Sequence, residues 1–180
     1  MGHRLSKIVT RTGDSGSSGL ANGDRLPKTH ARFAAMGDVD ELNSQIGLLL
    51  AQPLPAAIQS SLRQTQHELF NLGGELAMPG YALVNEAQVA RLDEQLAALN
   101  AQLPPLKEFV LPGGSPAAAQ AHVARAVARR AERALWTLHA QMPTNEYGLQ
   151  YLNRLSDYLF VIARTLARAQ GGEELSWSRA

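Results

Sequence analysis

The sequence has no cysteine, few aromatic residues and no long apolar run. The lack of cysteine excludes disulfide scaffolds, thiol nucleophiles and thiolate metal sites. Aromatic residues make up 6% of the chain, which argues against a β-sandwich or a β-barrel. No apolar segment reaches the length of a membrane span, and the N-terminus lacks the apolar core of a signal peptide. We therefore expect a cytoplasmic protein with no membrane partner.

Charge of neither sign is in excess, because 17 basic residues nearly balance 16 acidic ones. This balance gives no support to a general nucleic-acid-binding protein. The basic residues are unevenly chosen: 14 are arginine, and the only lysines are Lys7, Lys28 and Lys107. Alanine (28 residues) and leucine (27 residues) are abundant, and both favour helices.

The length of 180 residues fits a single domain, 1–180, with one hydrophobic core. Glycines and polar residues fill the segment 1–28, which we expect to be a glycine-rich loop. Apolar residues then recur at helical spacing, and proline or glycine separates the helical segments. The five expected helices cover 29–51, 55–77, 86–102, 116–141 and 146–169. The sequence thus predicts an all-α fold, a five-helix up-and-down bundle over 29–170, followed by a loose tail over 171–180.

Residues typical of helix starts support these boundaries. Pro55 suits the first position of the second helix. Asn85 and Asn145 can cap the third and fifth helices, because their side chains accept hydrogen bonds from free backbone N–H groups. Ser115 followed by Pro116 is a cap and first-position proline for the fourth helix.

Arginines cluster on the expected fourth helix. At about 100° per residue, Arg125, Arg129 and Arg133 fall within about 80° of one another, with Glu132 at the edge of the arc and His122 inside it. Guanidinium groups stacked in this way repel each other unless anions lie between them. Each planar guanidinium group can donate two parallel hydrogen bonds to a carboxylate or a phosphate. A solvated surface face explains the same pattern, so the helix alone leaves both interpretations open.

Two other helices carry polar residues of interest. Asn153, Asp157 and Arg164 share a polar stripe on the fifth helix. Asn43 falls inside the apolar arc of the first helix, so we expect it to be buried with a hydrogen-bond partner. Asp40 lies at the edge of that arc, where it can pair with an arginine of another helix or subunit.

The N-terminal segment has closely spaced glycines. Such spacing lets backbone N–H groups converge on an anion, while Thr10 and Thr12 add hydroxyls and Lys28 adds a positive charge. The segment does not fit the P-loop pattern, in which lysine directly follows the last glycine. A flexible linker is the alternative interpretation.

Six ordered blocks together resemble one known family. The N-terminal blocks are TRTGD-x-G at 10–16, G-x-R-x-PK at 23–28 and GDVDELN at 37–43. The C-terminal blocks are FVLPGG at 109–114, AR at 124–125 with RRAER at 129–133, and LNRLSD at 152–157. In this order they are similar to the PduO-type ATP:cob(I)alamin adenosyltransferases, over about residues 7–168.

The resemblance implies a trimer with active sites between subunits. It implies that the cobalt of cob(I)alamin attacks the 5′ carbon of ATP, so that adenosylcobalamin forms and tripolyphosphate leaves. ATP is then the cosubstrate, Mg²⁺ the accompanying cofactor and cobalamin the acceptor substrate. A cobalamin reductase and an adenosylcobalamin-dependent enzyme are the implied partners.

The resemblance also implies roles for particular residues. Those that would hold the triphosphate are Thr10, Arg11, Thr12, Gly13, Ser18, Gly19 and Lys28. Those that would complete the ATP site are Arg129, Glu132, Arg133 and Asn153. Asp40 and Arg125 would form a salt bridge between subunits, and Phe109 would crowd the lower corrin face and help to displace the lower axial ligand. No metal ligand is implied. The family often has threonine where this chain has Ser18. Serine keeps the hydroxyl but lacks the methyl group that restricts the rotamer of threonine.

Two other functions are compatible with the same residues. A helical adaptor or regulator could bind a nucleotide without turnover, which would need no corrin pocket. A structural bundle could carry the arginines only as a solvated face. Tight cobalamin binding would separate the enzyme from the first, and protection of residues 10–28 by ATP would count against the second.

Overall fold

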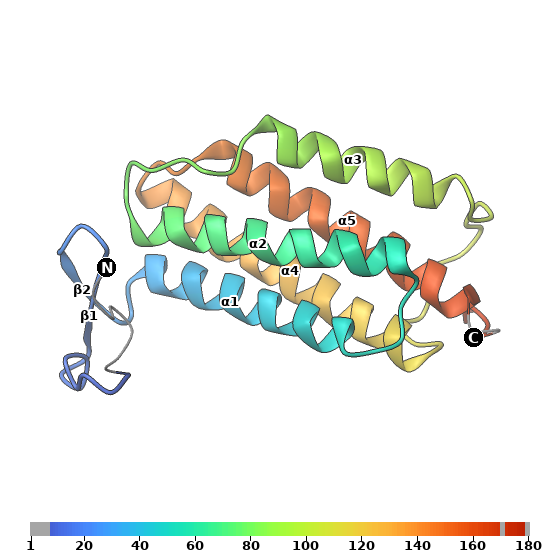
Figure 1. Ribbon diagram of the computed structural model, residues 1–180, viewed down its shortest axis with the longest axis horizontal. Coiled ribbons are helices and arrows are strands. Elements are labelled where there is room, and N and C mark those ends of the chain that lie inside the picture. Colours follow the sequence, from blue (N-terminus) through green and yellow to red (C-terminus); the bar gives the residue numbers. More distant parts are fainter. Residues whose placement is uncertain (1–7, 170–171, 179–180) are drawn as a thin grey trace.

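The computed structural model describes residues 8–169 and 172–178, and five helices make up most of it (Figure 1). The helices are α1 (Ala31–Leu50), α2 (Ala56–Ala77), α3 (Glu86–Asn100), α4 (Pro116–Gln141) and α5 (Glu146–Ala169). A small antiparallel hairpin, β1 (Ser17–Gly19) and β2 (Arg25–Pro27), precedes them. The expected five-helix fold is therefore confirmed. None of the described helices has both the length and the apolar character that a membrane span requires.

Local signals set the helix ends. Asn85 forms a capping box with Gln88, and the Ser115 hydroxyl accepts a hydrogen bond from the Ala118 amide (3.1 Å). Pro55 differs from the expectation, because it stands just before α2 rather than as its first helical residue. α1 begins later than expected, after His30, whose Nδ1 caps the helix by accepting from the Arg32 amide.

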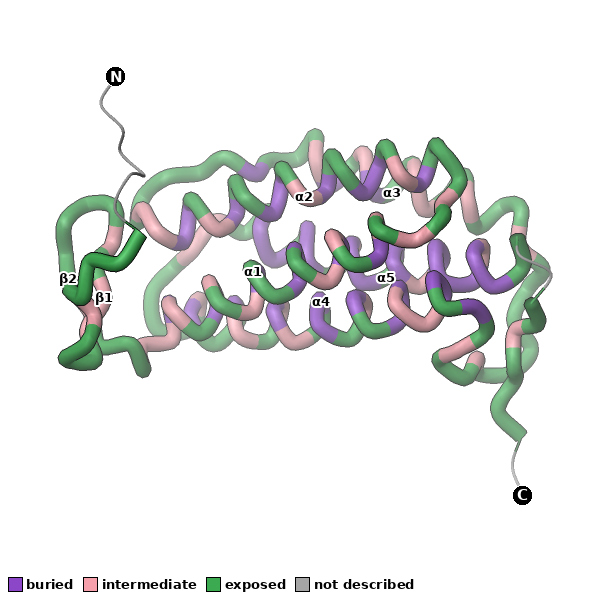
Figure 2. Tube along the Cα trace, turned by 60° about the horizontal axis from the view of Figure 1, so that its bottom comes forward, coloured by how far each residue is buried: buried purple, intermediate pink, exposed green. Residues whose placement is uncertain are grey.

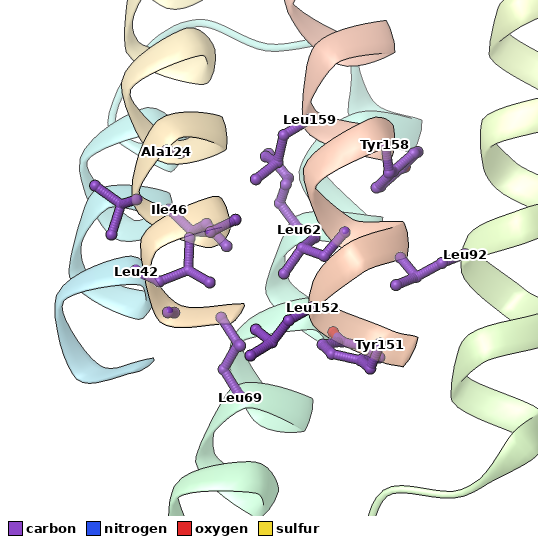
Figure 3. Packing of buried hydrophobic residues seen from close by; sticks show 14 of the residues in the cluster. Leu42, Ile46, Leu62, Leu69, Leu92, Ala124, Tyr151, Leu152, Tyr158 and Leu159 are labelled. Atoms are coloured by element: carbon purple, nitrogen blue, oxygen red, sulfur yellow. The ribbon is translucent and has the colours of Figure 1, made fainter. Parts of the chain in front are cut away.

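The helices run up and down along a common direction (Figure 1). α5 packs against both α3 and α4, and α1 packs against both α2 and α4. Buried residues line the inward faces, most densely along α5 (Figure 2). Leu42 of α1, Leu62 of α2 and Leu159 of α5 lie in the interior between these helices, whereas Tyr151 and Tyr158 lie on the side of α5 toward Leu92 of α3 (Figure 3).

A buried polar network joins α2, α3 and α5. Glu68 of α2 accepts hydrogen bonds from Arg91 of α3 and from the Tyr151 hydroxyl of α5 (2.8 Å). The Tyr158 hydroxyl donates to the Ser61 hydroxyl (2.8 Å). Burial, followed by the charge of Glu68, raises the pKa of Tyr151 well above its ordinary value, so this hydroxyl stays protonated as a donor.

The expectation that Asn43 is buried with a partner is confirmed. Its side-chain Nδ2 donates to the Gln66 carbonyl (3.2 Å), and Gln66 returns a hydrogen bond from Nε2 to the Asn43 carbonyl (3.3 Å). This reciprocal pair joins α1 to α2 at a site where an unpaired amide would be costly.

Three residues have an exposure that their place on the helix did not indicate. Arg164 shares a polar stripe with Asn153 and Asp157, yet it is buried, with 4% exposure, whereas those two are exposed. His122 is also buried and packs edge-on against Phe160 at 6.0 Å. Val123 lies on the side of α4 opposite the clustered arginines, among apolar residues, and is nevertheless 46% exposed. A helical wheel gives the angle of each residue but not which faces a distant segment covers, and that covering decides the burial.

The tail is not loose over 172–178. The Leu111 amide donates to the Leu175 carbonyl and the Trp177 amide donates to the Phe109 carbonyl, both at 2.7 Å. Glu174 makes ion pairs with arginines near the end of α5. The remaining tail residues, 171 and 179–180, lie outside the described part of the chain.

Candidate functional site

The segment expected to be a loop contains the hairpin, at the end of the bundle where α1 begins (Figure 1). Gly16 and Gly23 have φ values of 82° and 94°, which glycine adopts without steric cost. The Ala21 amide donates to the Ala77 carbonyl (2.8 Å), so the hairpin is attached to the last residue of α2. The segment is therefore built on turns and is anchored to the bundle.

Arg25 of β2 holds the stretch that precedes β1. Its Nη2 donates to the carbonyl oxygens of Thr12 (2.6 Å) and Ser17 (3.0 Å). The hydroxyls of Thr10 and Thr12 lie 3.0 Å apart. Sequence reasoning assigned no role to Arg25, although the 23–28 block contains it. Gly23 and Pro27 stand two residues before and after it, so the available signal was a long cationic side chain in a segment rich in turn-forming residues.

Lys28 lies over Gly13. A Cβ at position 13 would be 3.0 Å from the Lys28 Nζ, and the Lys28 amide donates to the Gly16 carbonyl (2.8 Å). Arg11 has φ of 60°, a left-handed conformation that is uncommon for a residue other than glycine. Residues 10–13 and Lys28 are thus brought together, and Ser18 and Gly19 lie on β1 nearby in the chain.

The four clustered arginines of α4 divide into two sets. Arg130 faces α1, where its Nε donates to Asp38 (3.1 Å) and its Nη2 pairs with Glu41. The other three form the arginine arc of α4, defined as Arg125, Arg129 and Arg133. The helical spacing placed Arg130 outside the arc. Its acidic partners lie on α1, so they follow only from the packing of α1 against α4.

The arginine arc lacks acidic partners within the described residues. Arg129 and Arg133 are exposed, and Arg133 donates to the Arg129 carbonyl (3.1 Å). Burial, together with the charge of Arg129, lowers the pKa of Arg125, and its buried Nε has no hydrogen-bond partner among the described residues. An anionic ligand or an acidic partner would compensate this concentration of positive charge.

Glu132 and Asn153 meet beside the arc. The Asn153 Nδ2 donates to the Glu132 Oε1 (3.3 Å), which joins α4 to α5. Both residues line a hollow of about 330 Å³ together with Trp136 and His139. Trp136 is 52% exposed, and its ring meets the His139 ring edge-on at 5.5 Å. The hollow offers an aromatic surface next to a carboxylate–amide pair.

Phe109 lies in the connector, defined as residues 101–115, between α3 and α4. Its side chain is 79% exposed, although its backbone carbonyl is hydrogen-bonded to the tail. It lines a hollow of about 290 Å³ with Val110 and Phe160. A large aromatic side chain that stays in solvent on a fixed backbone is suited to contact a flat apolar ligand.

The predicted site residues do not all meet within one chain. The hairpin and the connector lie at opposite ends of the bundle (Figure 1). α4 runs between those ends and has 26 residues, which corresponds to a length of about 39 Å. Asp40 lines a groove of about 510 Å³ over α1 and α2 with Phe70, and it forms no ion pair with Arg125 within the described residues. No single surface of the described part of the chain therefore presents all of these groups together.

Known proteins similar to this chain support one assignment. Residues 8–166 match the family model described as cobalamin adenosyltransferase. The chain is 59% identical over 180 residues to the cobalamin adenosyltransferase of Cupriavidus metallidurans, covering 99% of this chain and 98% of that protein. It is 42% identical over 181 residues to the corrinoid adenosyltransferase of Bacillus subtilis, covering 96% and 93%.

A solved structure agrees with these relatives. A variant PduO-type ATP:corrinoid adenosyltransferase from Lactobacillus reuteri, in complex with cobalamin and ATP, superposes with a TM-score of 0.91. Its sequence identity is 31%, and the match covers 96% of this chain and 100% of that chain. The similarity thus extends over nearly the whole chain in both sequence and fold, and the chain belongs to the cobalamin adenosyltransferase family of transferases.

Proposed function

We propose that this protein transfers the 5′-deoxyadenosyl group of ATP to the cobalt of cob(I)alamin, and that tripolyphosphate is released. In this reaction a cobalt–carbon bond forms as the bond from the 5′ carbon to the triphosphate oxygen breaks. The observation that carries the proposal is the arginine arc, three cations without acidic partners among the described residues, in a chain of this family. A structural bundle gives no reason for these uncompensated charges. A nucleotide-binding adaptor would account for them, but it would not account for the match to a family of transferases.

The N-terminal segment would hold the triphosphate. Lys28 and the backbone N–H groups around Gly13 lie together, so they can donate to the same phosphate oxygens. Thr10, Arg11 and Thr12 would add donors from the stretch that Arg25 holds in place. The Ser18 hydroxyl and the backbone at Gly19 would contact the ligand from β1. Mg²⁺ would enter bound to the phosphate oxygens of ATP, and the described residues contain no cluster of three or more metal-ligating side chains.

The arc of a neighbouring subunit would complete the ATP site. Arg129 and Arg133 would stabilise the charge that develops on the leaving tripolyphosphate, and Glu132 and Asn153 would hydrogen-bond the nucleoside. The nucleophile belongs to the corrinoid substrate, so the protein needs no serine, cysteine or general base. Its residues would work by holding the 5′ carbon in line with the cobalt.

Phe109 would act on the corrin side of the site. Its exposed ring would lie against the lower face of the macrocycle and leave no room for the lower axial ligand. Cobalt without that ligand is more easily reduced to the nucleophilic Co(I) state. A reductase is therefore the expected partner upstream of this reaction, and an enzyme that uses adenosylcobalamin the expected partner downstream.

A cyclic trimer would bring these groups together. Asp40 of α1 lines the groove over α1 and α2, Arg125 lies on α4, and the two form no ion pair within the described residues, which supports pairing between subunits. We expect Asp40→Arg and Arg125→Asp each to weaken the trimer in light-scattering measurements, and the double reversal to restore it. A double variant as weakly associated as the singles would remove this salt bridge from the proposal.

The catalytic proposal has a direct test. The protein is mixed with Mg-ATP and chemically reduced cobalamin, and formation of adenosylcobalamin is followed in the visible spectrum. Absence of product would refute the enzyme activity. Nucleotide binding without cobalamin binding would favour an adaptor, and failure of ATP to protect residues 10–28 from proteolysis would favour a structural bundle.

A further inference from the structure

The C-terminal tail is joined to the backbone that carries Phe109. The Trp177 amide donates to the Phe109 carbonyl and the Leu111 amide donates to the Leu175 carbonyl, both at 2.7 Å. Between these bonds, Val110 forms an antiparallel bridge with Ser176. Residues 109–111 and 175–177 thus form a short two-chain ribbon. The tail lies beyond the family match, which ends at residue 166.

A buried ion pair anchors this ribbon to α5. The Arg164 Nε donates to the Glu174 Oε1 (2.6 Å), and the Arg168 Nη1 donates to the Glu174 Oε2 (3.0 Å). The side chains of Arg164 and Glu174 are only 4% and 10% exposed. Burial alone would raise the pKa of Glu174, but hydrogen bonds and charge from the two arginines outweigh it and lower that pKa, so Glu174 is a carboxylate at neutral pH.

Arg164 also holds the connector itself. Its Nη2 donates to the Pro104 carbonyl (2.9 Å), five residues before Phe109. At the other end, Gly114 has φ of 96°, and a Cβ there would be 3.1 Å from the Ala167 Cβ of α5. The connector is therefore fixed before, at and after Phe109, either to α5 or to the tail. The Phe109 ring nevertheless remains free to contact a ligand.

We propose that Glu174 is a positioning residue that holds Phe109 in its place through the tail ribbon, with Arg164 as its anchor. The inference rests on the proposed function, because it assigns Phe109 to the corrin side of the site. Without the carboxylate, the tail loses its only described charged attachment to α5, and the Phe109 carbonyl loses a fixed donor. The ring would then sample several positions, and displacement of the lower axial ligand would be less complete.

The test compares Glu174→Gln with Glu173→Gln, a matched control at an exposed neighbour that makes no ion pair in the described chain. With cob(II)alamin reduced on the enzyme, we expect Glu174→Gln to lower kcat by roughly 10- to 100-fold, since a displacement of about 1 Å can have that effect. The KM for ATP should stay within about twofold. The absorption and EPR spectra of bound cob(II)alamin should show less of the form without a lower ligand. The control should match the wild type in every measurement.

A second pair of variants separates positioning from general damage to the fold. Glu174→Gln should add nothing to the defect of Phe109→Ala, because both act on one ring; full multiplication of the two defects would overturn the proposal. Arg168→Gln, which leaves the Arg164 pair intact, should show a smaller defect of the same kind. A rise in the KM for ATP as large as the fall in kcat in these variants would also overturn the proposal.

Hydrogen exchange decides the structural part independently of activity. In Glu174→Gln the Leu111 amide should exchange faster than in the wild type, while amides in the middle of α1 and α2 stay protected. Unchanged protection of Leu111 would refute the anchoring role, even if the wild type makes adenosylcobalamin. Wild type that makes none would refute the proposed function, and this exchange experiment would still decide whether Glu174 anchors the ribbon.

Discussion

Replacement of Arg129 should impair ATP use without affecting the fold. Its side chain is exposed and makes no ion pair within the described residues, so Arg129→Ala should change the free energy of unfolding by about 0.5 kcal/mol or less. In the complex, the guanidinium would make charge-assisted hydrogen bonds to phosphate, worth about 1.5–3 kcal/mol. Because about 1.4 kcal/mol corresponds to a factor of ten, kcat/KM for ATP should fall roughly 10- to 150-fold.

Arg130, the next residue, is the matched control with the opposite expectation. It pairs with Asp38 and Glu41, and its side chain is 42% exposed. Exposed pairs contribute about 0.2–1 kcal/mol each, so Arg130→Ala should cost about 0.5–2 kcal/mol. That corresponds to a decrease of a few degrees in Tm at fixed protein concentration, because about 1 kcal/mol shifts Tm by 2–4 °C in a chain of this size. Its ATP kinetics should stay within about twofold of the wild type.

The assay measures adenosylcobalamin formation at saturating cob(I)alamin over a range of Mg-ATP concentrations, with thermal unfolding of each variant alongside. Unchanged ATP kinetics in Arg129→Ala would remove Arg129 from the site. An ATP defect in Arg130→Ala as large as that in Arg129→Ala would show that total charge on α4, rather than the position of the arc, controls nucleotide use.

Three further outcomes are expected. Phe109→Ala should be more impaired when cob(II)alamin must be reduced on the enzyme than when free cob(I)alamin is supplied, and equal defects in steady-state rates would contradict the axial-ligand role. Tyr151→Phe should lower the free energy of unfolding by about 1.5–3 kcal/mol, because the Tyr151 hydroxyl donates to the Glu68 carboxylate. Tyr158→Phe loses a hydrogen bond to a neutral hydroxyl and should lower it by only about 0.5–1.5 kcal/mol. Urea unfolding compares the two variants, and the reverse order would be evidence against the network. Burial and neighbouring arginine charge lower the pKa of His122, so only the unfolded state takes up its proton as the pH falls below 6.5. Stability should therefore decline by up to about 1.4 kcal/mol per pH unit until the folded pKa is passed, and His122→Gln should lose this part of the slope in urea titrations between pH 7 and 5.5.

Helix positions could be predicted closely from the sequence. The fourth and fifth helices begin and end at the expected residues, 116–141 and 146–169. Apolar spacing, caps such as Ser115 and breaks at proline are properties of neighbouring residues, so they are present in the chain before it folds. The same reasoning identified Asn43, because an amide inside an apolar arc must find a partner wherever it packs.

The partners of charged side chains were decided only by the tertiary structure. Arg164 shares a polar stripe with exposed residues of α5, yet it is buried and paired with Glu174 of the tail. Arg130 and the arginine arc have the same residue type on one helix, and only the packing of α1 against α4 gives Arg130 its acidic partners. Local periodicity contains no information about which distant segment covers a helix face, and the desolvation and pairing of a charge depend on that covering.

The sequence by itself thus determined the positions of the helices and, through its ordered blocks, the family. The tertiary structure decided the exposure of Phe109, the anchoring of the tail and the separation of the hairpin from the connector at opposite ends of the bundle. The physical reason is range: helix formation depends on contacts three and four residues apart, whereas burial and charge compensation depend on segments brought together from far along the chain.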